Sequence, residues 1–171
     1  EATNNFDNYF VKYESSNNTD VGVWRETVKP ALDDNFNTAT MPHLLIRTAD
    51  GNFRYTPADG STYTISGVTY SVPAWGGRVA GDEDTSPHPE FIGQKISDIF
   101  FFRNRLGFLS GDNVFMSRAG GFFDLHPETV TTVLDTDPID IAVSHTKVAT
   151  LRHAIPFDET LLIFSDQSQF I

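Results

Sequence analysis

The sequence contains no cysteine, which excludes a disulfide framework, a thiolate metal site and a cysteine nucleophile. It has no run near the ~18 apolar residues that a membrane-spanning helix requires. Its first residues show no basic stretch followed by an apolar one, so no signal peptide is indicated. We therefore expect no membrane span and no cofactor. Because the chain starts at Glu1 and stops at Ile171 inside an apparent strand, we also expect it to be a segment of a longer protein.

Positive charge is scarce. The chain has 12 Lys and Arg against 23 Asp and Glu, and its formal net charge is −11. A surface of this sign repels phosphate groups and anionic lipids at neutral pH. A groove that grips nucleic acid is therefore not expected.

The residues that are abundant favour strands and turns. Fifteen phenylalanines and twelve glycines occur in 171 residues, and no segment keeps a 3.6-residue apolar period for three turns. We expect an all-β fold of antiparallel meanders, with at most a short helix after Pro127. The expected strands are Tyr9–Tyr13, Gly22–Val28, His43–Arg47, Phe53–Thr56, Tyr63–Ser66, Thr69–Val72, Ile99–Ser110, Asn113–Ser117, Ile139–Ser144, Ala149–Phe157 and Thr160–Ser165.

One stretch suggests a repeating unit. Gly111-Asp112 suits a two-residue turn, which pairs Phe108 with Phe115 and Leu109 with Val114 across a hairpin. Shifted by 48 positions, residues 113–123 align with residues 161–171 as strand, polar turn and apolar pair. This interval fits the ~40–50 residues of a β-propeller blade.

The repeat predicts both the domains and the core. We expect a β-rich segment with long loops at 1–90, including a hairpin insertion at 58–73, and a propeller-blade region at 91–171. Equivalent strand positions are expected to be buried alike, with Ser117 and Ser165 ending their strands. The predicted core residues are Phe108, Phe115, Val114, Met116, Leu162 and Phe164.

Three kinds of chemical site have simpler structural alternatives. Asp82, Glu83, Asp84, His88 and Glu90 could hold a divalent cation, but their spacing is not that of an EF-hand and an extended surface loop is favoured. A glycosidase could use Asp98 and Asp124 with Trp24 or Trp75, although such aromatic residues usually belong to a core. No nucleophile elbow occurs, and no catalytic or metal residue is assigned. Three further interpretations are structural: His145 and His153 as strand histidines, and Asp135 or Asp137 as a turn cap before Pro138.

The basic residues suggest a contact between subunits instead. Arg103, Arg105 and Arg118 form the one basic cluster of note, and the negative net charge opposes their use for nucleic acid. A neighbouring acidic loop offers them complementary charge. The expected subunit-contact residues are Arg103, Arg105, Arg118, Asp82, Glu83 and Asp84.

Five motifs occur along the chain in the order "TMPHLLIR", "WGGRVAGDEDTSPHPEFIGQKI", "RNRLGFLSGDNVFMSRAGGFFDL", "DPIDIAVSHTK" and "HAIPFDETLLIFSDQSQFI". In sequence and in order, these motifs resemble the tail nozzle family, also called tail tubular protein B, of short-tailed bacteriophages. The resemblance covers the chain from Tyr9 onward, except for residues 58–73.

The resemblance implies a structural, non-enzymatic subunit of a hexameric tail tube, built from a β-propeller with appended β domains. The implied partners are further copies of the chain and the adaptor and tail fibre proteins of the virion. DNA would pass through the tube without specific binding. The implied location is the phage tail, after synthesis in the host cytoplasm. A carbohydrate-binding or carbohydrate-active β protein that contacts the host surface remains the alternative.

Overall fold

The structure, a computed structural model, describes residues 9–15, 21–143, 150–166 and 168–171. These residues form strands, turns and loops without a helix, and every strand pairing between named strands is antiparallel. The prediction of an all-β antiparallel fold is confirmed. The strands are β1 (Phe10–Ser15), β2 (Gly22–Thr27), β3 (His43–Arg47), β4 (Phe53–Pro57), β5 (Thr62–Ile65), β6 (Val68–Ser71), β7 (Ile96–Phe102), β8 (Arg105–Ser110), β9 (Asn113–Met116), β10 (Ile139–Ala142), β11 (Leu151–Phe157), β12 (Thr160–Ser165) and β13 (Gln169–Phe170).

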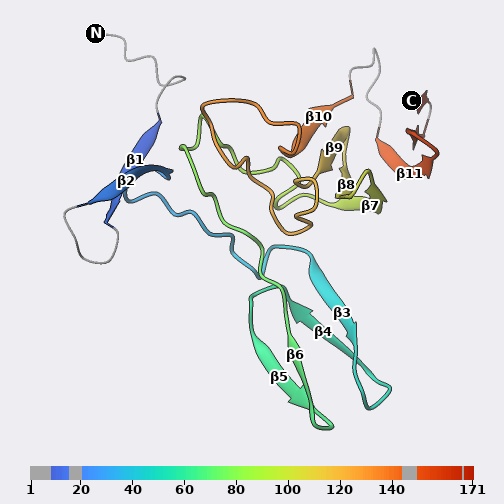
Figure 1. The fold of residues 1–171 in the computed structure, drawn as a ribbon. Coiled ribbons are helices and arrows are strands. Elements are labelled where there is room, and N and C mark those ends of the chain that lie inside the picture. Colours follow the sequence, from blue (N-terminus) through green and yellow to red (C-terminus); the bar gives the residue numbers. More distant parts are fainter. Residues whose placement is uncertain (1–8, 16–20, 144–149, 167) are drawn as a thin grey trace.

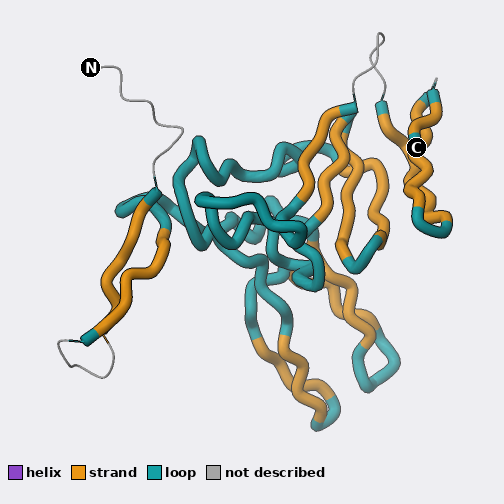
Figure 2. The backbone as a smooth tube through the Cα atoms, turned by 45° about the horizontal axis from the view of Figure 1, so that its top comes forward, coloured by secondary structure: helices purple, strands orange, loops and turns teal. Residues whose placement is uncertain are grey.

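The strands form three separate hairpins and two larger meanders. β1–β2, β3–β4 and β5–β6 are two-stranded, β7 to β10 form a four-stranded sheet, and β11 to β13 form a three-stranded sheet. The β3–β4 and β5–β6 hairpins extend together from one side of the body, and β1–β2 leaves it in another direction (Figure 1). Long irregular segments fill the body between these elements (Figure 2).

The predicted hairpin at the centre of the four-stranded sheet is confirmed. Phe108 pairs with Phe115 and Leu109 with Val114 across a turn in which Gly111 has φ 61°. A positive φ strains residues that carry a Cβ, so glycine suits this turn. The predicted hairpin within 58–73 is likewise confirmed as β5–β6.

The expected continuous strand Ile99–Ser110 is wrong. The chain reverses at Arg103 and Asn104, which have φ 46° and 59°, and this turn separates β7 from β8. A two-residue turn with positive φ matches the twist of a hairpin, and asparagine tolerates that conformation. Because apolar residues flank Arg103 and Asn104 on both sides, the sequence pattern predicted one continuous strand there.

No helix forms after Pro127, where at most a short one was expected, and residues 128–134 adopt bends and irregular loop. The β-branched residues in "TVTTV" lose side-chain freedom in a helix, and their hydrogen bonds are satisfied elsewhere. The Glu26 carboxylate of β2 accepts bonds from the Thr129 hydroxyl and the Val130 amide.

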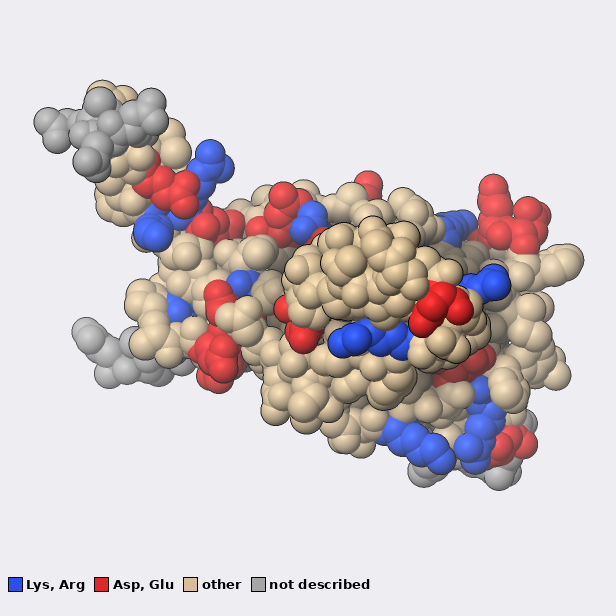
Figure 3. Space-filling view, turned by 90° about the horizontal axis from the view of Figure 1, so that it is seen from below, with Lys and Arg blue, Asp and Glu red and all other residues tan. Residues whose placement is uncertain are grey.

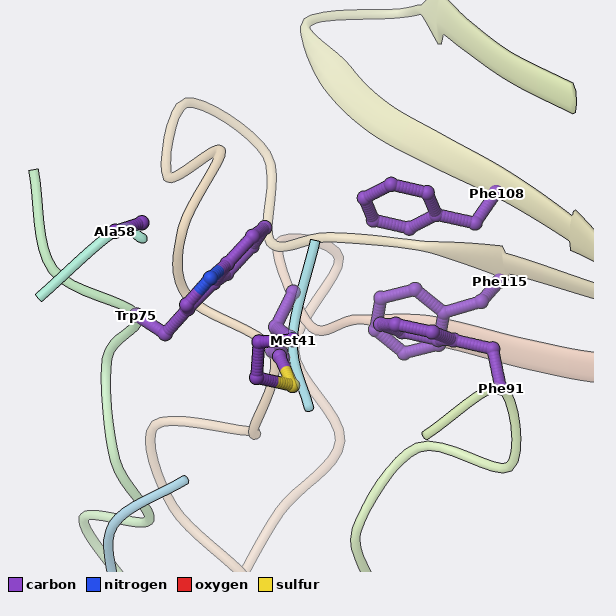
Figure 4. Close-up of a cluster of buried hydrophobic side chains, with 7 residues drawn as sticks. Met41, Ala58, Trp75, Phe91, Phe108 and Phe115 are labelled. Carbon is purple, nitrogen blue, oxygen red and sulfur yellow. The ribbon is translucent and has the colours of Figure 1, made fainter. Parts of the chain in front are cut away.

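The first of two apolar cores lies on one face of the β8–β9 hairpin. Phe108 and Phe115 point into it and meet the ring of Phe91, at centroid distances of 4.8 and 5.1 Å (Figure 4). The irregular segments supply its other side chains. Its buried members are Met41, Ala58, Trp75, Phe91, Phe108, Phe115 and Leu125.

The second core lies between the two larger sheets. Val114 and Met116 face this core from β9. On β12, Ile163 is buried in the core and Leu161 packs against it. Since Phe115 belongs to the first core, the hairpin β8–β9 is buried on both faces. The buried members of the second core are Phe100, Leu109, Val114, Met116, Leu151, Ala154 and Ile163.

Four of the six expected core residues are buried, namely Phe108, Phe115, Val114 and Met116. Leu162 and Phe164 differ from the expectation because they are only half-buried, whereas Ile163 between them is buried. Successive side chains of a strand point to opposite faces, so Ile163 and its two neighbours cannot share one core.

Candidate functional site

The three arginines expected to form one basic cluster have three different environments. Arg103 is exposed at the β7–β8 turn, where its guanidinium donates to the Glu159 carbonyl. Arg118 is half-buried and pairs with exposed Glu128 at 2.6 Å. Arg105 is buried. The structure therefore does not place them on one basic surface.

Arg105 fastens an irregular loop to the sheet through backbone carbonyls. Its side chain is 7% exposed and donates to the Ser117 carbonyl at 2.8 Å and the Asp135 carbonyl at 2.6 Å. It also donates to the carbonyls of Thr136 and Asp137. A buried guanidinium with several acceptors in fixed positions is a structural group, so Arg105 cannot serve as a subunit contact.

Asp82 in the acidic loop is also structural. It is 4% exposed, and its carboxylate accepts bonds from the amides of Asp84 and Thr85 and from the Thr85 hydroxyl. Burial acts to raise the Asp82 pKa, but these bonds outweigh it and hold the pKa below its usual value. Of the three acidic residues expected at a subunit contact, Glu83 and Asp84 are exposed and Asp82 is not.

A buried histidine forms a polar cluster that the sequence analysis did not identify. His126 is 2% exposed, its Nε2 lies 3.1 Å from His88 Nδ1, and Phe36 stacks on its ring. Burial and the nearby charges of Arg78 and His88 lower the pKa of His126 to about 3. Burial is also the main cause of the lowered His88 pKa. His126 is therefore neutral at physiological pH.

Acidification should weaken the fold through His126. Its pKa falls from 6.5 to about 3 on folding, so between these values the unfolded chain binds a proton that the folded chain does not. Stability is thus lost as pH falls, by about 1.4 kcal/mol per pH unit from this group. We expect His126→Gln to remove this component, as measured by urea unfolding from pH 7 to pH 4.5. Exposed His153→Gln serves as the control, and equal pH slopes for all three chains would contradict the assignment.

Arg78 is the second buried polar residue that the sequence analysis did not identify. It is 2% exposed and donates from Nε to the Ser86 carbonyl at 2.6 Å, which joins the loop after Trp75 to the acidic loop. Burial is the largest cause of its lowered pKa. Its position after "WGG" is the one available signal, since paired glycines allow close backbone approach.

The residues proposed for a glycosidase, apart from Trp24, make structural contacts within the fold. Asp98 accepts a bond from the Ala154 amide at 2.9 Å, and Asp124 lies against the backbone of Gly76. Trp75 is buried in the first core, where it cannot stack on a sugar, although Trp24 is exposed on β2. Nothing in this arrangement supports the carbohydrate alternative.

The remaining candidate residues are those of the metal site, the turn cap and the strand histidines. Within residues 9–15, 21–143, 150–166 and 168–171, no three His, Cys, Asp or Glu side chains gather as metal ligands. Asp137 caps its turn by accepting from the Leu134 amide. His153 lies on β11, as expected for a strand histidine, and His145 lies outside the described residues.

Among the hollows beside the larger sheets in the described residues, two differ clearly in character. One, of about 370 Å³, is lined by polar and charged residues at the β8–β9 turn, among them Glu90, Lys95 and Asp112. The other, of about 470 Å³, is a largely apolar groove between the two sheets, with Met116 and Ile163 on its walls.

No helix that could cross a membrane occurs in the part of the chain that the structure describes.

Comparison with known proteins adds the identity of the family. The whole chain, residues 1–171, matches the family described as bacteriophage nozzle protein. It is 41% identical over 171 residues to the tail tubular protein gp12 of Escherichia phage T7, which covers all of this chain and 19% of that protein. The chain thus spans about a fifth of the length of this relative and belongs to the bacteriophage nozzle protein family.

Proposed function

We propose that the chain is a structural wall segment of a phage tail nozzle, the tube through which the genome leaves the virion. The family match over the whole chain is the observation that carries this proposal. The fold is compatible with it, because the buried polar groups Arg78, Arg105 and Asp82 fasten loops rather than face a substrate. The role is mechanical, and we propose no enzymatic activity.

We further propose that residues 91–171 are blades of a β-propeller that repeat at an interval of 48. The orientation of side chains supports this. Phe115 and Ile163 occupy equivalent positions, and each faces the core that precedes its own sheet. Val114 faces the following sheet, so its equivalent Leu162 would face a further blade. This accounts for the half-burial of Leu162 and Phe164.

The blade proposal predicts different effects at neighbouring positions of β12. Ile163→Ala should lower the free energy of unfolding of the 171-residue chain by about 2–5 kcal/mol, because Ile163 is buried in the second core. Leu162→Ala should cost about 1 kcal/mol or less in this chain and more in the full-length protein, where a further blade would cover it. Denaturant titration of both lengths measures the difference. The same small cost for Leu162→Ala at both lengths would contradict the blade proposal.

Assembly into a hexamer, with the adaptor and tail fibre proteins as neighbours in the virion, completes the proposal. Charge complementarity supports a contact between subunits that uses exposed Glu83 and Asp84, with exposed Arg103 as one basic partner. The segment at 1–90 would supply projecting hairpins, and the segment at 91–171 the propeller wall.

An acidic wall also suits the passage of DNA. Each phosphate held by a basic side chain releases counterions and adds affinity, which would slow exit of the genome. With a net charge of −11, the chain should bind duplex DNA negligibly at physiological salt. A gel shift at micromolar protein with a steep salt dependence would contradict this prediction.

Electron micrographs of the full-length protein test the proposed function. Six-fold rings, incorporated into tails when supplied to a phage that lacks its own nozzle protein, are the expected result. The absence of rings together with clear binding on a glycan array would favour the carbohydrate alternative.

A further inference from the structure

We propose that the outward face of the β3–β4 hairpin is a contact surface for a second copy of this chain. This face consists of Leu45 and Arg47 on β3 with Phe53 and Tyr55 on β4, and it is called the outer face below. The inference rests on the proposed function, in which copies of the chain form a ring. The inference assigns a role to the β3–β4 and β5–β6 hairpins, residues 43–71, which are called the projection below. They lie outside the proposed propeller wall at 91–171.

The projection has a firm base. Met41 and Ala58, at the base of β3–β4, are buried in the first core, and the Trp75 amide donates to the Ala58 carbonyl at 3.3 Å. The two hairpins also contact each other, since the Arg54 guanidinium lies 4.2 Å from the centroid of the Tyr63 ring. Both hairpins nevertheless extend away from the body (Figures 1 and 2). Their outward faces are thus fixed in position and not covered by the body.

The two hairpins have outward faces of opposite character. On β5–β6, the cross-strand pairs Thr62–Ser71 and Thr64–Thr69 form a row of small hydroxyl side chains. The tyrosines Tyr63 and Tyr70 lie on the other face, which contacts β3–β4 through Arg54. The β5–β6 hairpin therefore presents polar side chains to solvent and apolar ones to its neighbour.

On the outer face of β3–β4, apolar and aromatic side chains point to solvent instead. Leu45, Phe53 and Tyr55 are 65, 63 and 71% exposed. They share one side of the hairpin, because Leu45 pairs with Tyr55 and Arg47 with Phe53. The Tyr55 ring stacks on His43 at 5.0 Å, which holds it in place on the exposed side. A contiguous aliphatic and aromatic surface on a rigid projection is typical of a protein contact.

Charge favours a copy of the chain as the partner. Within residues 43–71, Arg47 and Arg54 balance Asp50 and Asp59, so the projection is neutral and the remainder carries the whole net charge of −11. The charged bodies of two copies repel each other, whereas the projection can approach a body without repulsion. Viewed from the hairpin tips, the nearest surface is mostly uncharged (Figure 3).

The acidic loop of the body offers a complementary surface. Arg47 forms no ion pair among the described residues, and the same holds for exposed Glu83 and Asp84. Val79, near them in sequence, is 51% exposed. Two exposed carboxylates, with an exposed aliphatic side chain near them in sequence, match the arginine and apolar residues of the outer face. Because the two surfaces differ, the contact is head-to-tail, the type that closes rings.

Cross-linking between two differently tagged copies tests the contact, and the absence of cysteine in residues 1–171 simplifies it. A full-length copy with Tyr55→Cys is co-expressed with a full-length copy with Glu83→Cys, and a short bismaleimide is added. We expect a covalent product that contains both tags. Thr64→Cys, on the hydroxyl-lined face of β5–β6, is the matched control and should give at least roughly tenfold less product.

A second measurement uses rings. The double variant Leu45→Ser and Tyr55→Ser should require a roughly tenfold higher concentration to form rings, whereas Thr64→Ala and Thr69→Ala should not change it. Normal rings without a cross-link overturn the inference and leave the proposed function intact. Normal rings that lose another tail protein show a different partner and overturn it equally. A cross-link within one copy, formed when both cysteines are on the same chain, shows that the protein covers its own hairpin. If the unmodified protein forms no rings and no cross-link, the proposed function fails as well.

Discussion

Replacement of Arg105 by Met is expected to lower the free energy of unfolding by about 3–5 kcal/mol. The variant fills part of the space but leaves the carbonyls of Ser117, Asp135 and Asp137 without their donor. Each buried carbonyl that loses its partner costs about 1–3 kcal/mol, less where water can enter. Urea unfolding followed by tryptophan fluorescence measures the change.

Arg118→Met is the matched control for this prediction. Arg118 belonged to the same expected basic cluster, but its partner Glu128 is exposed. Such a pair contributes about 0–1 kcal/mol, so the control should remain close to the unmodified chain. Similar losses for both variants would show that Arg105 is not the fastening group described above.

Phe115→Ala is expected to cost about 3–5 kcal/mol, the range for emptying a large aromatic position in a core. Phe115 is 1% exposed, and its ring lies 5.1 Å from that of Phe91. The cavity would open at the cross-strand pair with Phe108, in a hairpin that both cores cover. Little relaxation is available there, because collapse on one side disturbs the packing on the other.

Phe101→Ala provides the comparison within the same sheet. Phe101 is 60% exposed on β7 and contacts only the edge of the Phe122 ring among aromatic neighbours in the described residues. We expect a loss of about 1 kcal/mol or less. Thermal unfolding of the two variants side by side separates the effects, and a larger loss for Phe101→Ala would contradict the assignment of the core.

The sequence predicted local pairing well because hairpins depend on neighbouring residues. Gly111 marked a turn, and alternating apolar residues on both sides set the register of Phe108 against Phe115. The turn at Arg103 and Asn104 was missed, since no glycine or proline marks it and apolar residues continue through it. Glycine was therefore a clear turn signal at Gly111, and the turn at Arg103 and Asn104 lacked such a signal.

The burial of charged residues was not predictable from local sequence. Arg105 and Arg118 belong to the same short stretch of sequence, yet one is buried under residues 135–137 and the other is paired at the surface. The difference depends on a loop that lies 30 residues away from Arg105 in the chain. His126 and Arg78 were missed for the same reason, because their burial results from contacts among irregular segments. The strand β12 shows a related limit, since the sequence pattern predicted its position but not which of its faces the second core would cover.

The way in which Arg105 holds its loop affects how this surface can evolve. The guanidinium binds only main-chain oxygens of residues 135–137, and every amino acid supplies such an oxygen. The side chains of Asp135 and Thr136 are exposed. Substitutions at these two positions can therefore change the chemistry of the outer surface while the path of the backbone is kept. This surface can therefore change by single substitutions at these positions, whereas a change at Arg105 would alter the loop itself.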